Sequence, residues 1–63
     1  MKTYIIYQDN KEIKRLENQT SDFPTLKYIQ SHQGQSLSWA LKNGGWKVEE
    51  IDEDTKESIF WKS

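Results

Sequence analysis

Cysteine is absent from the 63-residue sequence, which excludes disulfide bonds and thiolate metal sites. The single histidine, His32, cannot supply an all-protein zinc site, so we expect no metal and no cofactor. A chain this short forms one domain, spanning residues 1–63, and so small a core commonly needs extra stabilisation. We expect that stabilisation to come from aromatic packing, since aromatic residues make up 13% of the chain, or from association.

Long apolar stretches are also lacking, and none approaches the ~20 residues needed to cross a bilayer. The N-terminal segment MKTYIIYQDN has a very short apolar core and no small-residue cleavage site, so we expect no signal peptide. These features predict a cytoplasmic protein without a membrane span.

An excess of positive charge is missing as well, because the formal net charge is −1, which does not favour a general nucleic-acid binder. The charge is unevenly distributed. Residues 1–48 carry seven Lys and Arg against four Asp and Glu, whereas residues 49–63 carry six acids against two lysines. The acids cluster from Glu49 to Glu57, in a stretch without the glycine that a calcium-binding loop needs for its sharp turn. We therefore interpret the cluster as a solvated hairpin tip, with a divalent-cation site and an electrostatic contact with a basic partner as the alternatives.

The first part of the chain predicts a β-hairpin. Residues 3–7, TYIIY, are rich in β-branched and aromatic residues and indicate a strand. Asp9 and Asn10 follow as a turn signal, because both tolerate left-handed backbone geometry. Residues 12–17, EIKRLE, fit either a return strand or one helical turn, and the short preceding loop favours the strand.

Residues 26–46 form the central element, a predicted helix that is either continuous or broken at Gly34. Ser21 or Asp22 can cap its start, and Pro24 suits a first helical turn. Ser36 can begin a second helix after a break, and Gly44 and Gly45 can end it. Apolar residues recur at spacings of three and four on one face, at Phe23, Leu26, Ile29, Leu37, Ala40 and Leu41.

The C-terminal part predicts a second hairpin, with strands at 46–51 and 57–62 around a polar turn at 52–56. The complete pattern predicts an α+β domain of order ββαββ, in which two hairpins form one antiparallel sheet with the helix packed on one face.

These strands carry apolar residues on both sides, although apolar and polar residues normally alternate along the strands of a sheet with one solvent-exposed face. With a three-residue loop in the second hairpin, Val48 would oppose Phe60. The helix would cover one face and leave an apolar patch on the other, composed of Ile5, Tyr7, Ile51, Ile59 and Trp61. A two-residue loop would change this register but still leave apolar residues on both faces. Such a patch on a small domain predicts a non-enzymatic regulatory module that binds a protein partner or forms a homodimer.

Two alternative functions remain open from the sequence. Lys11, Lys14 and Arg15, together with sheet aromatics, predict single-stranded nucleic-acid binding, although one arginine in the whole chain weakens this prediction. His32 with a carboxylate predicts a small hydrolase or nuclease, but the sequence identifies no nucleophile or orienting acid beside it.

The segment ALKNGGWKVEEIDEDTKESIFW resembles the core of the HicA messenger-RNA endonuclease toxins, in which a helix ends in Asn-Gly and leads through Trp into a hairpin. The resemblance covers about a third of the chain and implies this helix–hairpin arrangement. In that family the catalytic histidine lies in the hairpin, whereas His32 precedes Trp46, so the endonuclease activity does not transfer.

Overall fold

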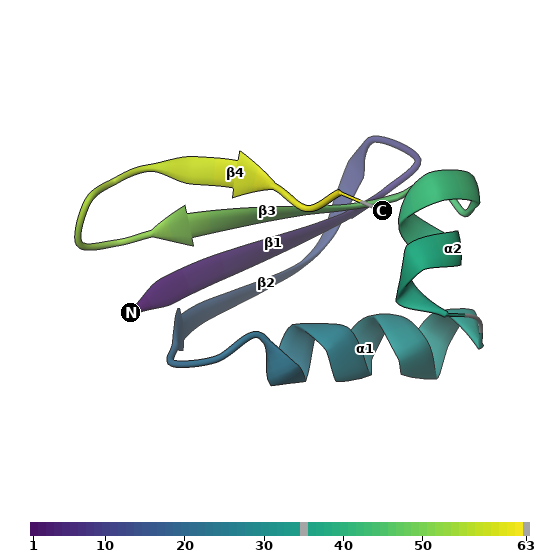
Figure 1. The fold of residues 1–63 in the computed structure, drawn as a ribbon, viewed down its shortest axis with the longest axis horizontal. Helices are drawn as coiled ribbons and strands as arrows, with labels where there is room; N and C mark the ends of the chain where they lie inside the picture. The colour runs from purple at the N-terminus through teal and green to yellow at the C-terminus, as the bar shows by residue number, and fades with distance from the viewer. Residues whose placement is uncertain (35, 63) are drawn as a thin grey trace.

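The computed structural model describes residues 1–34 and 36–62 and contains an antiparallel sheet with two helices (Figure 1). The strand order across the sheet is β2-β1-β3-β4, so β1 and β3 are central and β2 and β4 are the edges. The α+β class and the two hairpins are confirmed, and the element order is ββααββ. The elements are β1 Lys2–Gln8, β2 Lys11–Gln19, α1 Phe23–Gln33, α2 Leu37–Asn43, β3 Trp46–Asp52 and β4 Ser58–Phe60.

The predicted helix is broken at Gly34, and the two pieces point in different directions (Figure 1). Gly34 ends α1 with a φ of 74°, in the left-handed region, and donates its N–H to the Gln30 carbonyl at 3.0 Å. Ser36 then caps α2, because its side chain accepts a hydrogen bond from the Trp39 N–H at 3.2 Å. The alternative of two short helices is therefore confirmed.

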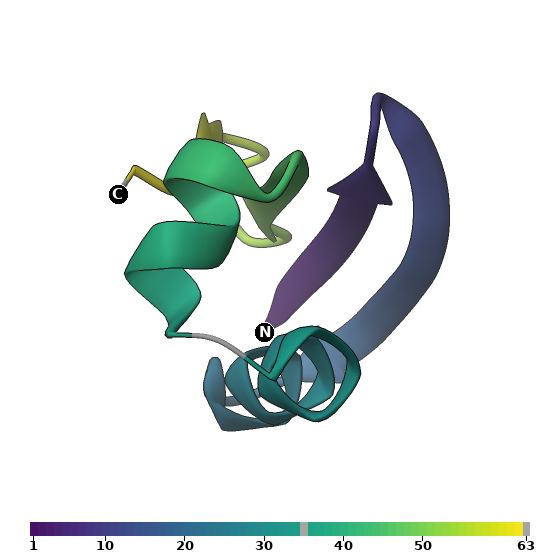
Figure 2. The same cartoon turned by 90° about the vertical axis from the view of Figure 1, so that its right-hand side faces the viewer.

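Residues 12–17 belong to a strand, as predicted, and β2 extends beyond them in both directions. Asp9 and Asn10 form the connecting turn, with φ values of 53° and 68°. The pairing of β1 with β2 shifts register twice, and Ile13 is the extra residue at one shift. Figure 2 shows β2 bending along its length, as bulged strands do.

The core lies between the helices and one face of the sheet, which we call the core-side face. Its buried apolar cluster joins the central strands to both helices, through Tyr4, Ile6, Trp46, Val48, Ile29 and Ala40. Phe23 does not continue this stripe, because its side chain is 56% exposed. Thr25 is fully buried, and its hydroxyl has no hydrogen-bond partner within the described residues.

The predicted register of the second hairpin is wrong by one residue. Glu49 pairs with Phe60 and Glu50 with Ile59, instead of Val48 with Phe60. A one-residue slip moves every side chain to the opposite face. Phe60 therefore lies on the open face, opposite the helices, whereas Ile59 and Trp61 lie on the core-side face.

Neither helix in the described part of the chain is long and apolar enough to cross a membrane.

Candidate interaction groove

The five residues of the predicted apolar patch do not share one surface. Ile5, Tyr7 and Ile51 lie on the open face, as expected, but Ile5 is only 4% exposed between its neighbours on β2 and β3. Tyr7 is half-buried, and its hydroxyl donates to a Glu49 carboxylate oxygen at 3.1 Å. The open-face patch that remains consists of Tyr7, Ile51 and Phe60, with the Tyr7 and Phe60 ring centroids 6.4 Å apart.

Ile59 and Trp61 contribute to a different surface, an apolar groove of about 660 Å³ between β4 and the helices. One wall comes from α1 and α2, and the other from β4 and the residues after it, which run toward α2 (Figure 1). We call it the β4 groove and define it by Leu26, Leu37, Leu41, Ile59 and Trp61; Phe60 also borders it, although its ring lies on the open face against Tyr7. Asp22 and Lys62 complete its lining.

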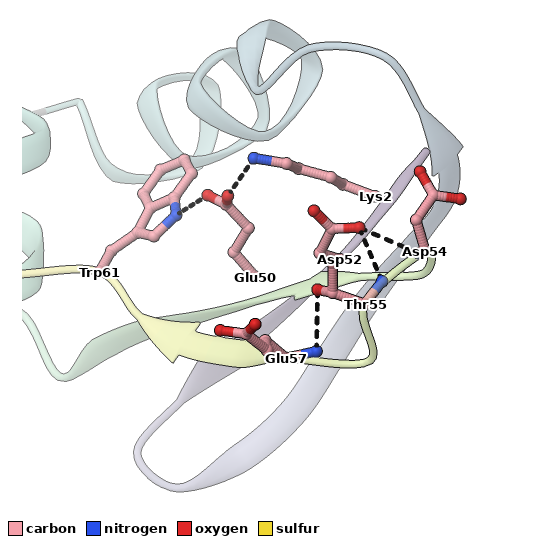
Figure 3. Close-up of polar contacts among 7 residues, drawn as sticks. All are labelled: Lys2, Glu50, Asp52, Asp54, Thr55, Glu57 and Trp61. Atoms are coloured by element: carbon pink, nitrogen blue, oxygen red, sulfur yellow. Dashed lines mark hydrogen bonds and ion pairs between the residues drawn. The ribbon is translucent and has the colours of Figure 1, made fainter.

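Trp61 is held in place on the groove wall by three contacts. Its backbone N–H donates to the Val48 carbonyl at 2.9 Å, which continues the pairing beyond the end of β4. Its indole Nε1 donates to Glu50 Oε1 at 2.9 Å (Figure 3). Its ring meets Tyr4 edge to face, with the centroids 5.9 Å apart. These contacts fix the position of this wall of the groove.

Glu50 connects Trp61 to the first strand, because its other oxygen accepts a hydrogen bond from Lys2 Nζ at 2.7 Å (Figure 3). The Lys2 hydrogen bond lowers the pKa of Glu50 below its ordinary value; burial opposes this shift, and the bond from Trp61 supports it. The same hydrogen bond raises the pKa of Lys2. The pair is therefore ionised at neutral pH.

A second, polar hollow of about 250 Å³ adjoins the groove. We call it the acidic hollow; it is lined by Lys2, Glu50, Asp52, Thr55, Glu57 and Ile59. Asp52 accepts hydrogen bonds from the backbone N–H groups of Asp54 and Thr55, at 2.9 and 3.4 Å (Figure 3). These bonds, the Asp54 bond first, lower the pKa of Asp52. The predicted acidic hairpin tip is thus partly ordered by its own backbone.

The basic residues considered for nucleic-acid binding are divided between the two faces. Lys11 and Lys14 pair with Gln8 and Ile6 on the core-side face, whereas Arg15 pairs with Ile5 on the open face. Arg15 is also engaged with Glu12, whose carboxylate lies 3.2 Å from its guanidinium nitrogen. No single surface collects the three charges, and nucleic-acid binding stays a prediction.

His32 is exposed on the last turn of α1. Its ring stacks on Tyr28 with centroids 4.1 Å apart, and its Nδ1 lies 2.9 Å from the Tyr28 carbonyl oxygen. The neighbouring Ser31 hydroxyl donates to the same carbonyl at 2.9 Å. All of these contacts lie within the last turns of α1. A hydrolase role for His32 stays a prediction.

The sequence interpretation missed the helical wall of the groove. Leu26, Leu37 and Leu41 belong to the predicted apolar stripe and were expected to pack against the sheet. In the structure these side chains are half-buried and line the groove, because β4 is too short to cover them. The break at Gly34 was the signal that two short helices would leave part of their apolar surface uncovered.

Comparison of the chain with protein-family models, with curated proteins and with solved structures finds no match.

Proposed function

We propose that this protein is a non-enzymatic interaction module that binds an apolar segment of a partner protein in the β4 groove. The observation that carries the proposal is the groove itself, an apolar hollow of about 660 Å³ in a chain of 63 residues. Its volume falls within the range of natural binding sites, roughly 300–1,000 Å³. Its position at a sheet edge also suits an extended or helical segment. The cytoplasmic location expected from the sequence belongs to the same proposal.

A foreign segment is a better occupant than a symmetric second copy. A stable dimer interface buries about 800 Å² on each partner, nearly a fifth of the 4353 Å² surface of this chain. The open-face patch offers only Tyr7, Ile51 and Phe60, and it is bordered by the charged side chains of Glu49 and Lys47. The groove is concave, and a two-fold interface requires a surface that complements itself.

The test is a selection of random 12-residue peptides, displayed on phage, against the full-length protein. Ile59→Asp places a charge on the groove wall at a side chain that is 59% exposed, so the fold should survive. Ile13→Asp is the matched control, because Ile13 is also exposed but lies on β2, at the opposite edge. We expect Ile59→Asp to lower the affinity for the selected peptides about tenfold or more, which corresponds to a loss of roughly 1.4 kcal/mol or more of binding free energy. Ile13→Asp should leave that affinity unchanged.

Equal binding to wild type and Ile59→Asp would contradict the proposal. Sedimentation at micromolar concentration adds an independent check. A monomer is expected, and a stable dimer that Ile59→Asp leaves intact would favour the open face instead.

A further inference from the structure

The β4 groove and the acidic hollow form one continuous surface. Ile59 lines both of them. Glu50 lines the hollow and holds the Trp61 indole, which lines the groove, at 2.9 Å (Figure 3). A segment that fills the groove and continues past Ile59 therefore comes next to the carboxylates of the second hairpin.

The acidic hollow has an excess of negative charge, with three carboxylates against the single ammonium group of Lys2. Lys2 is engaged with Glu50 at 2.7 Å and also attracts Asp52, but one ammonium group does not balance three carboxylates. Asp52 is kept ionised by its backbone hydrogen bonds, and Glu57 is exposed. Within the described residues, the Glu57 carboxylate has no hydrogen bond or ion pair. Glu53 and Asp54 add negative charge in the same loop, which Lys56 and the N-terminal ammonium group, 3.4 Å from Asp54, offset in part.

We infer that the segment bound by the β4 groove is basic, with apolar side chains in the groove and Lys or Arg residues that continue into the acidic hollow. This inference rests on the proposed function. The charge of the hollow selects the partner, because an acidic or uncharged continuation would leave its excess of negative charge unbalanced. A guanidinium group suits these carboxylates best, since it can donate two parallel hydrogen bonds to one of them.

A second copy of this chain is a weaker candidate for the same surface. Its most basic exposed stretch is Lys11–Arg15 on β2, where Ile13 is 38% exposed. That stretch is interrupted by Glu12, which pairs with Arg15, and by a bulge. Docking β2 of one copy onto the β4 groove of the next would also be a head-to-tail contact, which propagates into open chains unless it closes into a ring.

The composition of the selected peptides tests this inference. Among peptides whose binding depends on Ile59, we expect Lys and Arg to be enriched on one side of the apolar residues. We expect their affinity to fall with added salt, because exposed charge pairs are screened.

Glu57→Lys should lower the affinity for these peptides about three- to tenfold, since it replaces an attraction with a repulsion. Glu17→Lys makes the same charge change on β2, at another exposed glutamate, and should leave binding unchanged.

The outcomes separate the inference from the proposed function. Peptides that depend on Ile59 but carry no basic residues, and that tolerate Glu57→Lys, would overturn the inference while the proposed function stands. An absence of any Ile59-dependent peptide would overturn both. Salt-sensitive self-association that Ile59→Asp abolishes would show that the occupant is a second copy, which also overturns the inference.

Discussion

The two edge strands of the sheet differ in length, in charge and in the surface beside them. The β2 edge is nine residues long and mostly exposed, it carries alternating charges, and its pairing with β1 is interrupted twice. Charged side chains and bulges are features by which natural proteins prevent an edge strand from pairing with another chain. The β4 edge is three residues long and lies beside the apolar groove. The comparison supports the proposal that a partner binds at the β4 side and not at the β2 edge.

The largest expected difference is between an isoleucine in the core and one on the β4 edge. Ile6 is fully buried under the helices, so Ile6→Ala should lower the free energy of unfolding by about 2–5 kcal/mol, much of the stability of so small a domain. Ile59→Ala, at a side chain that is 59% exposed, should cost less than about 1 kcal/mol. Urea denaturation followed by circular dichroism measures both. Equal losses would mean that β4 is part of the core and not an open edge.

The next effect concerns the junction of the two hairpins. Gly45 has a φ of 76°, its carbonyl accepts the Asp9 N–H at 2.9 Å, and a Cβ there would clash with Asp9 Oδ1. Gly45→Ala should therefore cost about 2 kcal/mol, mostly backbone strain, with a smaller cost for moving the flexible Asp9 carboxylate away.

Gly34→Ala is the matched control for that junction. Gly34 has nearly the same φ, 74°, but a Cβ there has no atom within 4 Å, so about 1–2 kcal/mol of strain is expected. Thermal melts compare the two variants. A cost at Gly34 as large as that at Gly45 would show that contact with the Asp9 turn contributes little.

A smaller effect is expected from Glu50, which stabilises the β4 side through Lys2 and Trp61. Because the folded state lowers the pKa of Glu50, its contribution is present above the ordinary carboxyl pKa and is lost as pH falls through the lower folded value. Glu50→Gln should cost about 1 kcal/mol at neutral pH and nothing in strong acid. Denaturation at several pH values tests this, with Glu17→Gln on β2 as the control. If the difference in unfolding free energy between wild type and Glu50→Gln does not depend on pH, the stabilisation does not come from the charge of Glu50.

The smallest effect is expected on the β2 edge. Arg15→Ala removes an ion pair whose side chains are 45% and 42% exposed, so the free energy of unfolding should change by less than about 1 kcal/mol. The variant should also remain monomeric by sedimentation. Self-association of Arg15→Ala would show instead that this charge is what keeps the β2 edge from pairing.

Features set by local backbone chemistry could be predicted from the sequence. Asp9 and Asn10 tolerate the left-handed geometry of a tight hairpin turn, which they adopt with positive φ values. Gly34 was a candidate break and Ser36 a candidate cap for a second helix, with a continuous helix left open, and the structure shows both the break and the cap. These predictions succeed because each depends on one or two residues and their immediate neighbours.

The register of the second hairpin could not be predicted, because it depends on how its loop closes. The Asp52 N–H donates to the Glu57 carbonyl at 2.8 Å, and the Lys56 N–H donates to the Asp52 carbonyl at 2.7 Å. Lys56 adopts a φ of 65°, in the left-handed region that its residue type does not favour. Without a glycine to mark that position, the sequence does not distinguish this loop from a shorter one. The one-residue difference exchanged Phe60 with Ile59 and Trp61 between the faces.

The sequence by itself determined the elements: two hairpins, a helical region with a candidate break at Gly34, and more apolar residues than one covered face can hold. Only the tertiary structure decided where the surplus lies, by placing β1 and β3 at the centre of the sheet and leaving β4 short beside Leu26, Leu37 and Leu41. The physical reason is the distance along the chain between the residues that form each feature. Turns and caps are set by neighbouring residues, whereas the groove is formed by side chains more than thirty positions apart, such as Leu26 and Trp61, which meet only after the sheet and helices have packed.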